Sequence, residues 1–254
     1  MNGAVLPLVA GAALAGGAAY WRYASPYSQA LGHFPMEGTA DPGAPTLALS
    51  FDDGPNEPHT SRLLDVLAER GVQGTFFQVG RCVERHPGLT RALADAGHVI
   101  GNHSYSHQWS RGWRAADIRD EVDRADEVLA AELGRRPLLY RPPWLLRSPD
   151  LFRVMATRGL QPVSGEFCHP LEPWQPAPER IARRAARRIR SGRILIFHDG
   201  YDARGGDRAN TVEAVARLID DGLERGYTFT TVDRLLGVPA YAERVPPGLT
   251  SGHE

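Results

Sequence analysis

The segment LALSFDDGP, residues 47–55, has the pattern of a buried strand that ends in two adjacent carboxylates. Asp52 and Asp53 follow the apolar run directly, and Gly54-Pro55 then marks a turn. A buried carboxylate costs free energy unless another group compensates its charge. The rest of the chain is therefore expected to supply compensating groups at the end of this strand.

Length, charge and cysteine content limit the class of protein. The 254 residues suffice for one large domain with a sizeable core. The formal net charge of −1 gives no overall field favouring nucleic acid, so we expect no nucleic-acid partner. All 29 basic residues are arginine, which we attribute first to genome composition. The two cysteines, Cys82 and Cys168, exclude a disulfide framework and a cysteine-rich zinc site and leave one disulfide open.

The N-terminal part differs from the rest. Residues 4–21, AVLPLVAGAALAGGAAYW, are uncharged and rich in Ala and Gly. At about 1.5 Å per residue, a helix of this length just crosses a hydrocarbon core of roughly 30 Å. A cleaved signal normally begins with positive residues, and no Lys or Arg precedes this run. We interpret residues 1–23 as a membrane anchor or signal peptide, with a soluble apolar arm as the alternative. Residues 24–45, with scattered Pro, Gly and Ser, are a linker or a wrapping arm.

Residues 46–238 alternate strand and helix patterns, which is typical of an α/β domain with parallel strands. Expected strands cover residues 46–51, 73–80, 98–102, 138–141, 160–165, 193–200 and 227–232. About seven β/α units favour a closed or partly open α/β barrel, with an open doubly wound sheet as the alternative. Residues 239–254 are a C-terminal tail.

Unusual polar residues follow four of these strands. The pair at 52–53 ends the first, His103 follows the third, Arg141 the fourth and His198 ends the sixth. In such barrels the chemistry gathers where strands end. We therefore expect these side chains to meet in one site.

The segment GNHSYSH, residues 101–107, places His103 and His107 four residues apart, as on one turn of a helix, so that both imidazoles can face one point. With Asp53 they give a set of two histidines and one carboxylate. Such a set suits a catalytic divalent metal with an open position for water. Zinc suits it best, and cobalt, nickel or iron also fit. A solvated helix face or a capping pair is the alternative for the histidines alone.

The second carboxylate, Asp52, could act as general base beside the metal's water. Arg141 in YRPPW, residues 140–144, could hold Asp52 by a bidentate fork. The two prolines lack N–H donors, so the Trp144 N–H is the next available donor and could face an oxyanion. The alternatives are a surface ion pair for Arg141 and core packing for Trp144.

Further candidates lie in the second half of the chain. His198 could be a general acid, or a structural histidine at a strand end. His169, beside Cys168, is a candidate extra metal ligand. The arginine-rich segment 178–192 is predicted to be a helix with a solvated basic face, or one that contacts anionic lipid headgroups.

In combination, these motifs resemble the polysaccharide deacetylase family, the carbohydrate esterases with NodB homology (family 4). The resemblance runs from about Thr46 to Leu236. It depends on the ordered motifs SFDDGP (50–55), PHT (58–60), GTFFQVG (74–80), GHVIGNHSYSH (97–107), YRPPW (140–144), ILIFHDG (194–200) and RGYTFTTVDRLL (225–236).

The resemblance implies a distorted (β/α)7–8 barrel and a role for each matched residue: Asp52 as base, His198 as acid, Asp53, His103 and His107 as metal ligands, Arg141 orienting Asp52, and Trp144 lining the pocket with its N–H available. We also expect Pro143, Tyr140 and Trp174 to bind substrate together with Trp144. One segment departs from the family pattern. The family usually has an aspartate, often followed by Trp, that hydrogen-bonds the acid histidine. Here the segment is GEFCHPLEPW, residues 165–174, so Glu172 is the expected replacement and Glu166 the alternative.

The predicted function is metal-dependent removal of N-acetyl groups from a glycan that contains N-acetylglucosamine, such as peptidoglycan, a chitin-like oligosaccharide or an envelope polysaccharide, with release of acetate. The alternatives are an O-acetyl esterase of xylan type, a non-catalytic glycan-binding member of the fold, and a membrane-tethered structural protein. We expect a monomer, tethered through residues 4–21 and facing the exterior or periplasm, or secreted.

Overall fold

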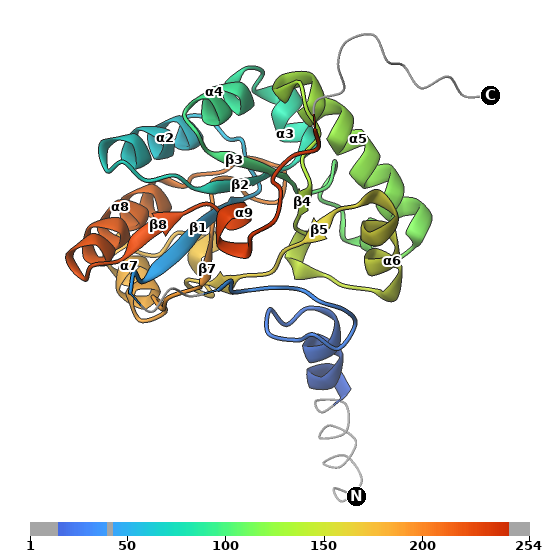
Figure 1. Ribbon diagram of the computed structural model, residues 1–254, viewed down its shortest axis with the longest axis horizontal. Coiled ribbons are helices and arrows are strands. Elements are labelled where there is room, and N and C mark those ends of the chain that lie inside the picture. Colours follow the sequence, from blue (N-terminus) through green and yellow to red (C-terminus); the bar gives the residue numbers. More distant parts are fainter. Residues whose placement is uncertain (1–14, 40–42, 244–254) are drawn as a thin grey trace, which may run out of the picture.

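The fold is built on a sheet of parallel strands that curls into a partly closed barrel (Figure 1). The computed structural model describes residues 15–39 and 43–243. The strand order is β5-β4-β3-β2-β1-β7-β6, and β8 also pairs with β1. The strands are β1 Thr46–Asp52, β2 Thr75–Gln78, β3 Val99–Asn102, β4 Leu139–Tyr140, β5 Gln161–Pro162, β6 Glu166–Phe167, β7 Ile194–His198 and β8 Thr228–Thr230.

The central strand β1 sets the position of the site. Its residues from Leu47 to Phe51 are buried, as expected for a parallel strand covered on both faces. Its ladder places Asp52 opposite Phe77 of β2 and opposite His198 of β7. The register therefore brings a carboxylate and an imidazole, 146 positions apart by residue number (198 − 52), to the same end of the barrel.

Helices surround the sheet (Figure 1). The α-helices are α2 His59–Glu69, α3 Gly80–Arg85, α4 Leu89–Asp95, α5 Ala115–Leu133, α6 Pro149–Arg158, α7 Pro178–Ala186, α8 Ala209–Glu224 and α9 Val232–Leu236, with 3-10 turns at Trp109–Gly112, Pro143–Leu145 and Glu172–Trp174. The apolar stripe of α5 is buried, as its 3.6-residue period predicts.

The predicted elements are confirmed in order and type, with differences at their ends. The expected helix at 178–192 ends at Ala186. Helix α3 was not predicted, because six residues are too few to show a periodic pattern. The expected strand at 160–165 has only two ladder residues, and the separate short strand β6 follows it.

Residues 24–39 form a wrapping arm against the barrel. The buried guanidinium of Arg147 donates to the carbonyl oxygens of Ser25 and Ser28 at 2.5 and 3.0 Å. Phe34 is fully buried and packs with apolar side chains of the barrel. This arm is therefore part of the folded unit and not a free linker.

Most of the apolar run at 4–21 lies in residues 1–14, outside the described residues. Residues 15–23 are helical. Among the helices that the structure describes, none has both the length and the apolar character needed to cross a membrane. The assignment of residues 1–23 as an anchor or signal peptide stays a prediction.

The start of the predicted tail also packs on the barrel. The Ile100 N–H donates to the Tyr241 hydroxyl at 2.8 Å, and Tyr241 forms an antiparallel bridge with Pro137. Residues 244–254 lie outside the described residues.

Both cysteines are buried and carry free thiols, so no disulfide joins them. Burial raises the pKa of the Cys82 thiol to about 11 and that of Cys168 well above its usual value. Since the thiolate is the reactive form, neither thiol is suited to nucleophilic chemistry at neutral pH.

Candidate active site

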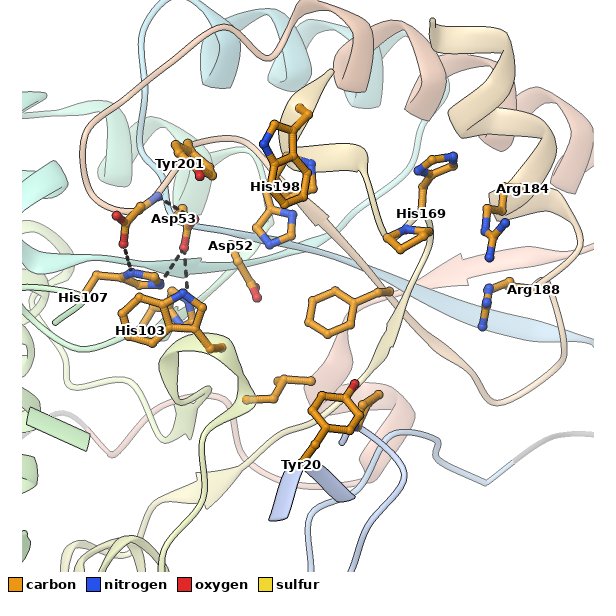
Figure 2. A pocket seen from close by; sticks show the side chains of 18 of the residues that line it. Tyr20, Asp52, Asp53, His103, His107, His169, Arg184, Arg188, His198 and Tyr201 are labelled. Atoms are coloured by element: carbon orange, nitrogen blue, oxygen red, sulfur yellow. Dashed lines mark hydrogen bonds and ion pairs between the residues drawn. The ribbon is translucent and has the colours of Figure 1, made fainter. Parts of the chain in front are cut away.

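A cavity of about 530 Å³ opens at the carboxyl ends of β1, β3 and β7 (Figure 2). Its wall includes five of the predicted catalytic and metal-ligand residues, namely Asp52, Asp53, His103, His107 and His198. Arg141 lies behind this wall and is fully buried. The structure thus brings the polar groups of four separate strand ends together.

Three of these residues form a compact set of metal-ligand atoms. Asp53 Oδ1 lies 3.2 Å from His103 Nε2 and 3.1 Å from His107 Nε2. The three donor atoms all lie within 4.8 Å of one another. All three residues are buried, at 5 % exposure or less. Two imidazole nitrogens and a carboxylate oxygen fit a catalytic zinc site.

The outer nitrogen of each imidazole is also held. His103 Nδ1 lies 2.6 Å from the carbonyl oxygen of Arg141, and His107 Nδ1 lies 2.9 Å from Asp202 Oδ1. In the structure, the Nε2 atoms hydrogen-bond Asp53 Oδ1. With a cation bound, a proton on each Nδ1 would satisfy these acceptors and leave the Nε2 lone pairs for the cation. This is the arrangement that metal-binding histidines usually have, so the residues present fit the metal.

Asp202 also fixes the orientation of Asp53. Its backbone N–H donates to Asp53 Oδ2 at 2.9 Å, which leaves Asp53 Oδ1 for the cation. Sequence reasoning missed Asp202. The only signal for it in the sequence is its place in the polar loop after HDG. In the structure its φ is +48°, in the left-handed region that Asp tolerates better than most residues.

The charge state of Asp53 suits a metal ligand. Burial disfavours the carboxylate, but the charge of His107 and hydrogen bonds from His103 and His107 outweigh it. The pKa of Asp53 is therefore well below its usual value, and the side chain is ionised at neutral pH.

The two histidines meet at one point, but not through a helical turn. Residues 103–107 form a loop in which Ser104 and His107 have φ of +67° and +56°. The expectation of a helix here was wrong. The loop is fixed instead by Glu121 of α5, whose carboxylate accepts hydrogen bonds from the N–H and hydroxyl of Ser106 at 2.7 and 2.8 Å.

Arg141 contacts Asp52 through one hydrogen bond, from Nη1 to Oδ1 at 2.7 Å. The expected bidentate fork is wrong, because Nε and Nη2 donate instead to the carbonyl oxygens of Val163 and Ser164. Within the described part of the chain, no hydrogen bond occupies Asp52 Oδ2. One oxygen of this carboxylate is therefore fixed while the other is available at the cavity wall.

His198 is held by Glu172, the residue expected to replace the family aspartate. His198 Nδ1 lies 2.6 Å from Glu172 Oε2. Burial alone would lower the pKa of His198, but the Glu172 carboxylate raises it to about 9. Glu172 is itself 2 % exposed and accepts a hydrogen bond from the Thr211 hydroxyl. The alternative, Glu166, pairs with Arg188 and does not contact His198.

With this geometry established, comparison with known proteins identifies the family. The family model for polysaccharide deacetylase matches residues 39–163. A peptidoglycan-N-acetylglucosamine deacetylase of Bacillus cereus is 33 % identical over 192 residues, which cover 75 % of this chain and 87 % of that protein. The chain belongs to the polysaccharide deacetylase family.

Two further comparisons agree with this assignment. A chitooligosaccharide deacetylase of Sinorhizobium fredii is 32 % identical over 202 residues, covering 76 % of this chain and 91 % of that protein. The crystal structure of the Bc1960 peptidoglycan N-acetylglucosamine deacetylase shares the fold, with a TM-score of 0.75 at 24 % identity over 87 % of this chain and 96 % of that chain.

Two glycines of this polysaccharide deacetylase let the FDDGP and HDG motifs pack closely, Gly54 against the carboxylate of Asp199 and Gly200 against the backbone of Asp53. A Cβ on Gly54 would lie 2.1 Å from Asp199 Oδ2, and one on Gly200 would lie 2.2 Å from the carbonyl oxygen of Asp53. Thr60, the last residue of the PHT motif, donates its hydroxyl to Asp199 Oδ2 at 2.6 Å. These contacts hold the ends of β1 and β7 together.

Trp144 contributes both its ring and its backbone to the site. The ring lines the cavity, is 38 % exposed, and has its centroid 4.3 Å from that of His107. The residue has a φ of +53°. No hydrogen bond is made by its N–H to any described residue, so this donor is available to a ligand.

Of the other predicted substrate-binding residues, Trp174 lines the cavity and is 71 % exposed. The prediction that Tyr140 binds substrate is wrong. Tyr140 is 3 % exposed and packs in the apolar cluster under α5 and α6, because its side of the short strand β4 faces the core. Pro143 lines a small neighbouring recess instead of the catalytic cavity. His169 lines the cavity, but within the described residues the metal-ligand group excludes it.

Proposed function

We propose that this polysaccharide deacetylase is a metal-dependent hydrolase that removes N-acetyl groups from a glycan containing N-acetylglucosamine and releases acetate. One observation carries the proposal. A single cavity holds three converging metal-ligand atoms, a carboxylate fixed by a buried arginine, and an imidazole fixed by a buried carboxylate. The relatives named as peptidoglycan-N-acetylglucosamine deacetylase and chitooligosaccharide deacetylase support it.

Asp53, His103 and His107 would hold the divalent cation, and their donor set favours zinc. Cobalt, nickel and iron also accept two imidazoles and a carboxylate. When bound, such a cation supplies Lewis acidity toward the acetyl carbonyl and lowers the pKa of water.

Asp52 is placed to act as the general base. Its free oxygen faces the cavity, so it can accept a proton from the attacking water while Arg141 keeps the other oxygen in place. The Trp144 N–H can donate to the oxyanion that develops when the water oxygen bonds to the carbonyl carbon.

His198 is placed to act as the general acid. With a pKa of about 9 it is protonated at neutral pH, and Glu172 stabilises this imidazolium. Transfer of its proton to the amide nitrogen accompanies cleavage of the C–N bond. The products are acetate and a free amino sugar.

The decisive experiment measures acetate release from N-acetylglucosamine oligomers, peptidoglycan and acetylxylan, with and without a chelator. We expect release from the N-acetylated substrates, abolished by chelation and restored by zinc. Release from acetylxylan alone would make the protein an O-acetyl esterase. Binding of a stoichiometric metal without release from any substrate would make it a non-catalytic member of the family.

We further propose that the enzyme acts outside the cytoplasm, tethered through residues 4–21 or secreted. The uncharged run and the relatives named for peptidoglycan support this location. Cell fractionation tests it, because recovery of the protein in the cytoplasmic fraction would contradict it.

A further inference from the structure

Helix α7 and the residue after it carry arginines without counter-ions. Arg180, Arg183, Arg184 and Arg187 have the spacings of three, four and seven residues that place side chains on one helix face. Within residues 15–39 and 43–243, none of the four forms an ion pair. The nearby acids are used elsewhere, since Glu179 pairs with Arg217 and Glu166 with Arg188. Like charges at these spacings repel one another, and no ion pair within the described residues relieves this repulsion.

These four arginines and His169 line a recess of about 250 Å³. Arg184 and His169 also line the catalytic cavity, together with Arg188, so the recess and the cavity adjoin. Figure 2 shows the metal-ligand residues at one end of the cavity, Arg184 and Arg188 at the other, and His198 between them. Positive charge therefore lies beside the path of a chain that occupies the cavity.

His169 adds a neutral donor to the recess. Its Nδ1 accepts a hydrogen bond from the Leu171 N–H at 3.0 Å, so its proton is on Nε2. Burial and the charges of Arg184 and Arg180 lower its pKa, which keeps the ring neutral at pH 7. The recess thus presents only donors to a ligand.

We propose that this basic recess binds carboxylate or phosphate groups of the same glycan whose acetyl group enters the catalytic cavity. The inference rests on the proposed function and narrows its substrate to an acidic N-acetylated glycan. Guanidinium forks match both anions in shape and charge. Because Arg184 and His169 belong to the wall of the cavity, the geometry favours an anionic group on the substrate over a lipid surface.

The test compares three oligomers of equal length: neutral N-acetylglucosamine, N-acetylglucosamine alternating with N-acetylmuramic acid, and 6-phosphorylated N-acetylglucosamine. The variant combines Arg184→Gln with Arg187→Gln. The matched control combines Arg91→Gln with Arg190→Gln, two exposed arginines outside the recess and the cavity. Acetate release by the whole protein gives kcat/KM for each oligomer.

We expect the recess variant to lose about tenfold or more in kcat/KM on one or both acidic oligomers and to stay within about twofold on the neutral one, as one or two charge-assisted contacts imply. Which acidic oligomer is affected identifies carboxylate or phosphate as the anion. Added NaCl should reduce the preference of the unmodified protein for acidic oligomers and leave the recess variant nearly unchanged.

Equal kcat/KM of the unmodified protein and the recess variant on every acidic oligomer, with the neutral oligomer turned over, would overturn this inference alone. Absence of acetate from all three oligomers would instead overturn the proposed function. The alternative, binding of the recess to anionic lipid, is tested by sedimenting the protein with phosphatidylglycerol vesicles and, for comparison, with phosphatidylcholine vesicles. If the recess variant loses binding to the anionic vesicles but keeps full turnover of acidic oligomers, the proposal is wrong.

Discussion

The two ends of the catalytic cavity are built differently. At the metal-ligand end, Asp53, His103 and His107 are almost fully buried, and each has a second contact that fixes its orientation. At the other end, where the cavity adjoins the basic recess, the recess residues Arg184 and Arg187 are exposed and have no ion pair within the described residues. Groups that react must be held within a fraction of an ångström, whereas groups that only attract a charged substrate tolerate side-chain motion.

This difference implies different outcomes of substitution. A change at the buried end should affect every substrate, because it alters the reaction itself. A change in the basic recess should affect only substrates that carry negative charge. The predictions below test this contrast in order of decreasing effect.

The largest effect is expected for Asp53→Ala. It removes one of three metal-ligand atoms, so zinc should be lost and turnover should fall by about 10⁴-fold on all substrates. Atomic absorption of the purified variant and acetate release check both results. A variant that keeps one zinc per chain would show that Asp53 is not a ligand.

Asp52→Asn should reduce kcat by about 10² to 10⁴-fold while the metal stays bound. The amide preserves the shape and the contact with Arg141 but accepts a proton poorly. The metal content of the same sample separates this result from that of Asp53→Ala. Full turnover by Asp52→Asn would exclude this residue as the base.

Glu172→Gln should change the pH dependence of kcat/KM. His198 must be protonated to act as an acid, and its raised pKa keeps it protonated until the pH rises through about 9. In the unmodified enzyme the rate should therefore decline only above about pH 9. Without the Glu172 charge the pKa of His198 falls, so the decline should begin at a lower pH.

Glu166→Gln is the matched control for this experiment, because the same change is made in a carboxylate that pairs with Arg188 instead of His198. Its pH profile should equal that of the unmodified enzyme. Identical profiles for Glu172→Gln and Glu166→Gln would contradict the role of Glu172.

Asp202→Ala should weaken zinc affinity by about 10 to 100-fold, because it removes the acceptor for His107 Nδ1. Asp202→Asn keeps an acceptor oxygen and tolerates the left-handed backbone, so its effect should be smaller. Competition with a metal-binding dye measures both variants. Equal zinc affinities of Asp202→Ala and the unmodified protein would remove Asp202 from the metal site.

The sequence was informative where a reactive residue directly follows a run of apolar residues. The buried run before Asp52 and the apolar run before His198 predicted both the barrel and the meeting of these residues, since parallel strands share an edge. Tyr140 shows the limit of this reasoning. Its strand has only two residues, so the sequence contains no alternation of polar and apolar residues from which to predict which side faces the cavity.

The groups that orient the site were harder to predict. Asp202 reaches Asp53 across 149 positions and belongs to a loop without periodicity, so its contacts depend on the finished fold. The single hydrogen bond between Arg141 and Asp52 likewise depends on two carbonyl groups beyond β5 that compete for the guanidinium. Glu172 was found only because the resemblance indicated that a partner for His198 was missing.

The wrapping arm extends the folded unit beyond the start of the family-model match. The family match begins at residue 39, yet Tyr20, Pro26 and Tyr27 form part of the cavity wall and Phe34 lies in the interior. A fragment that began at residue 39 would lose the part of the cavity wall formed by the arm and would expose the apolar side chains that Phe34 covers. If the proposed tether through residues 4–21 is correct, attachment would also determine how that entrance faces a polymer layer, so that attachment and access would be geometrically linked.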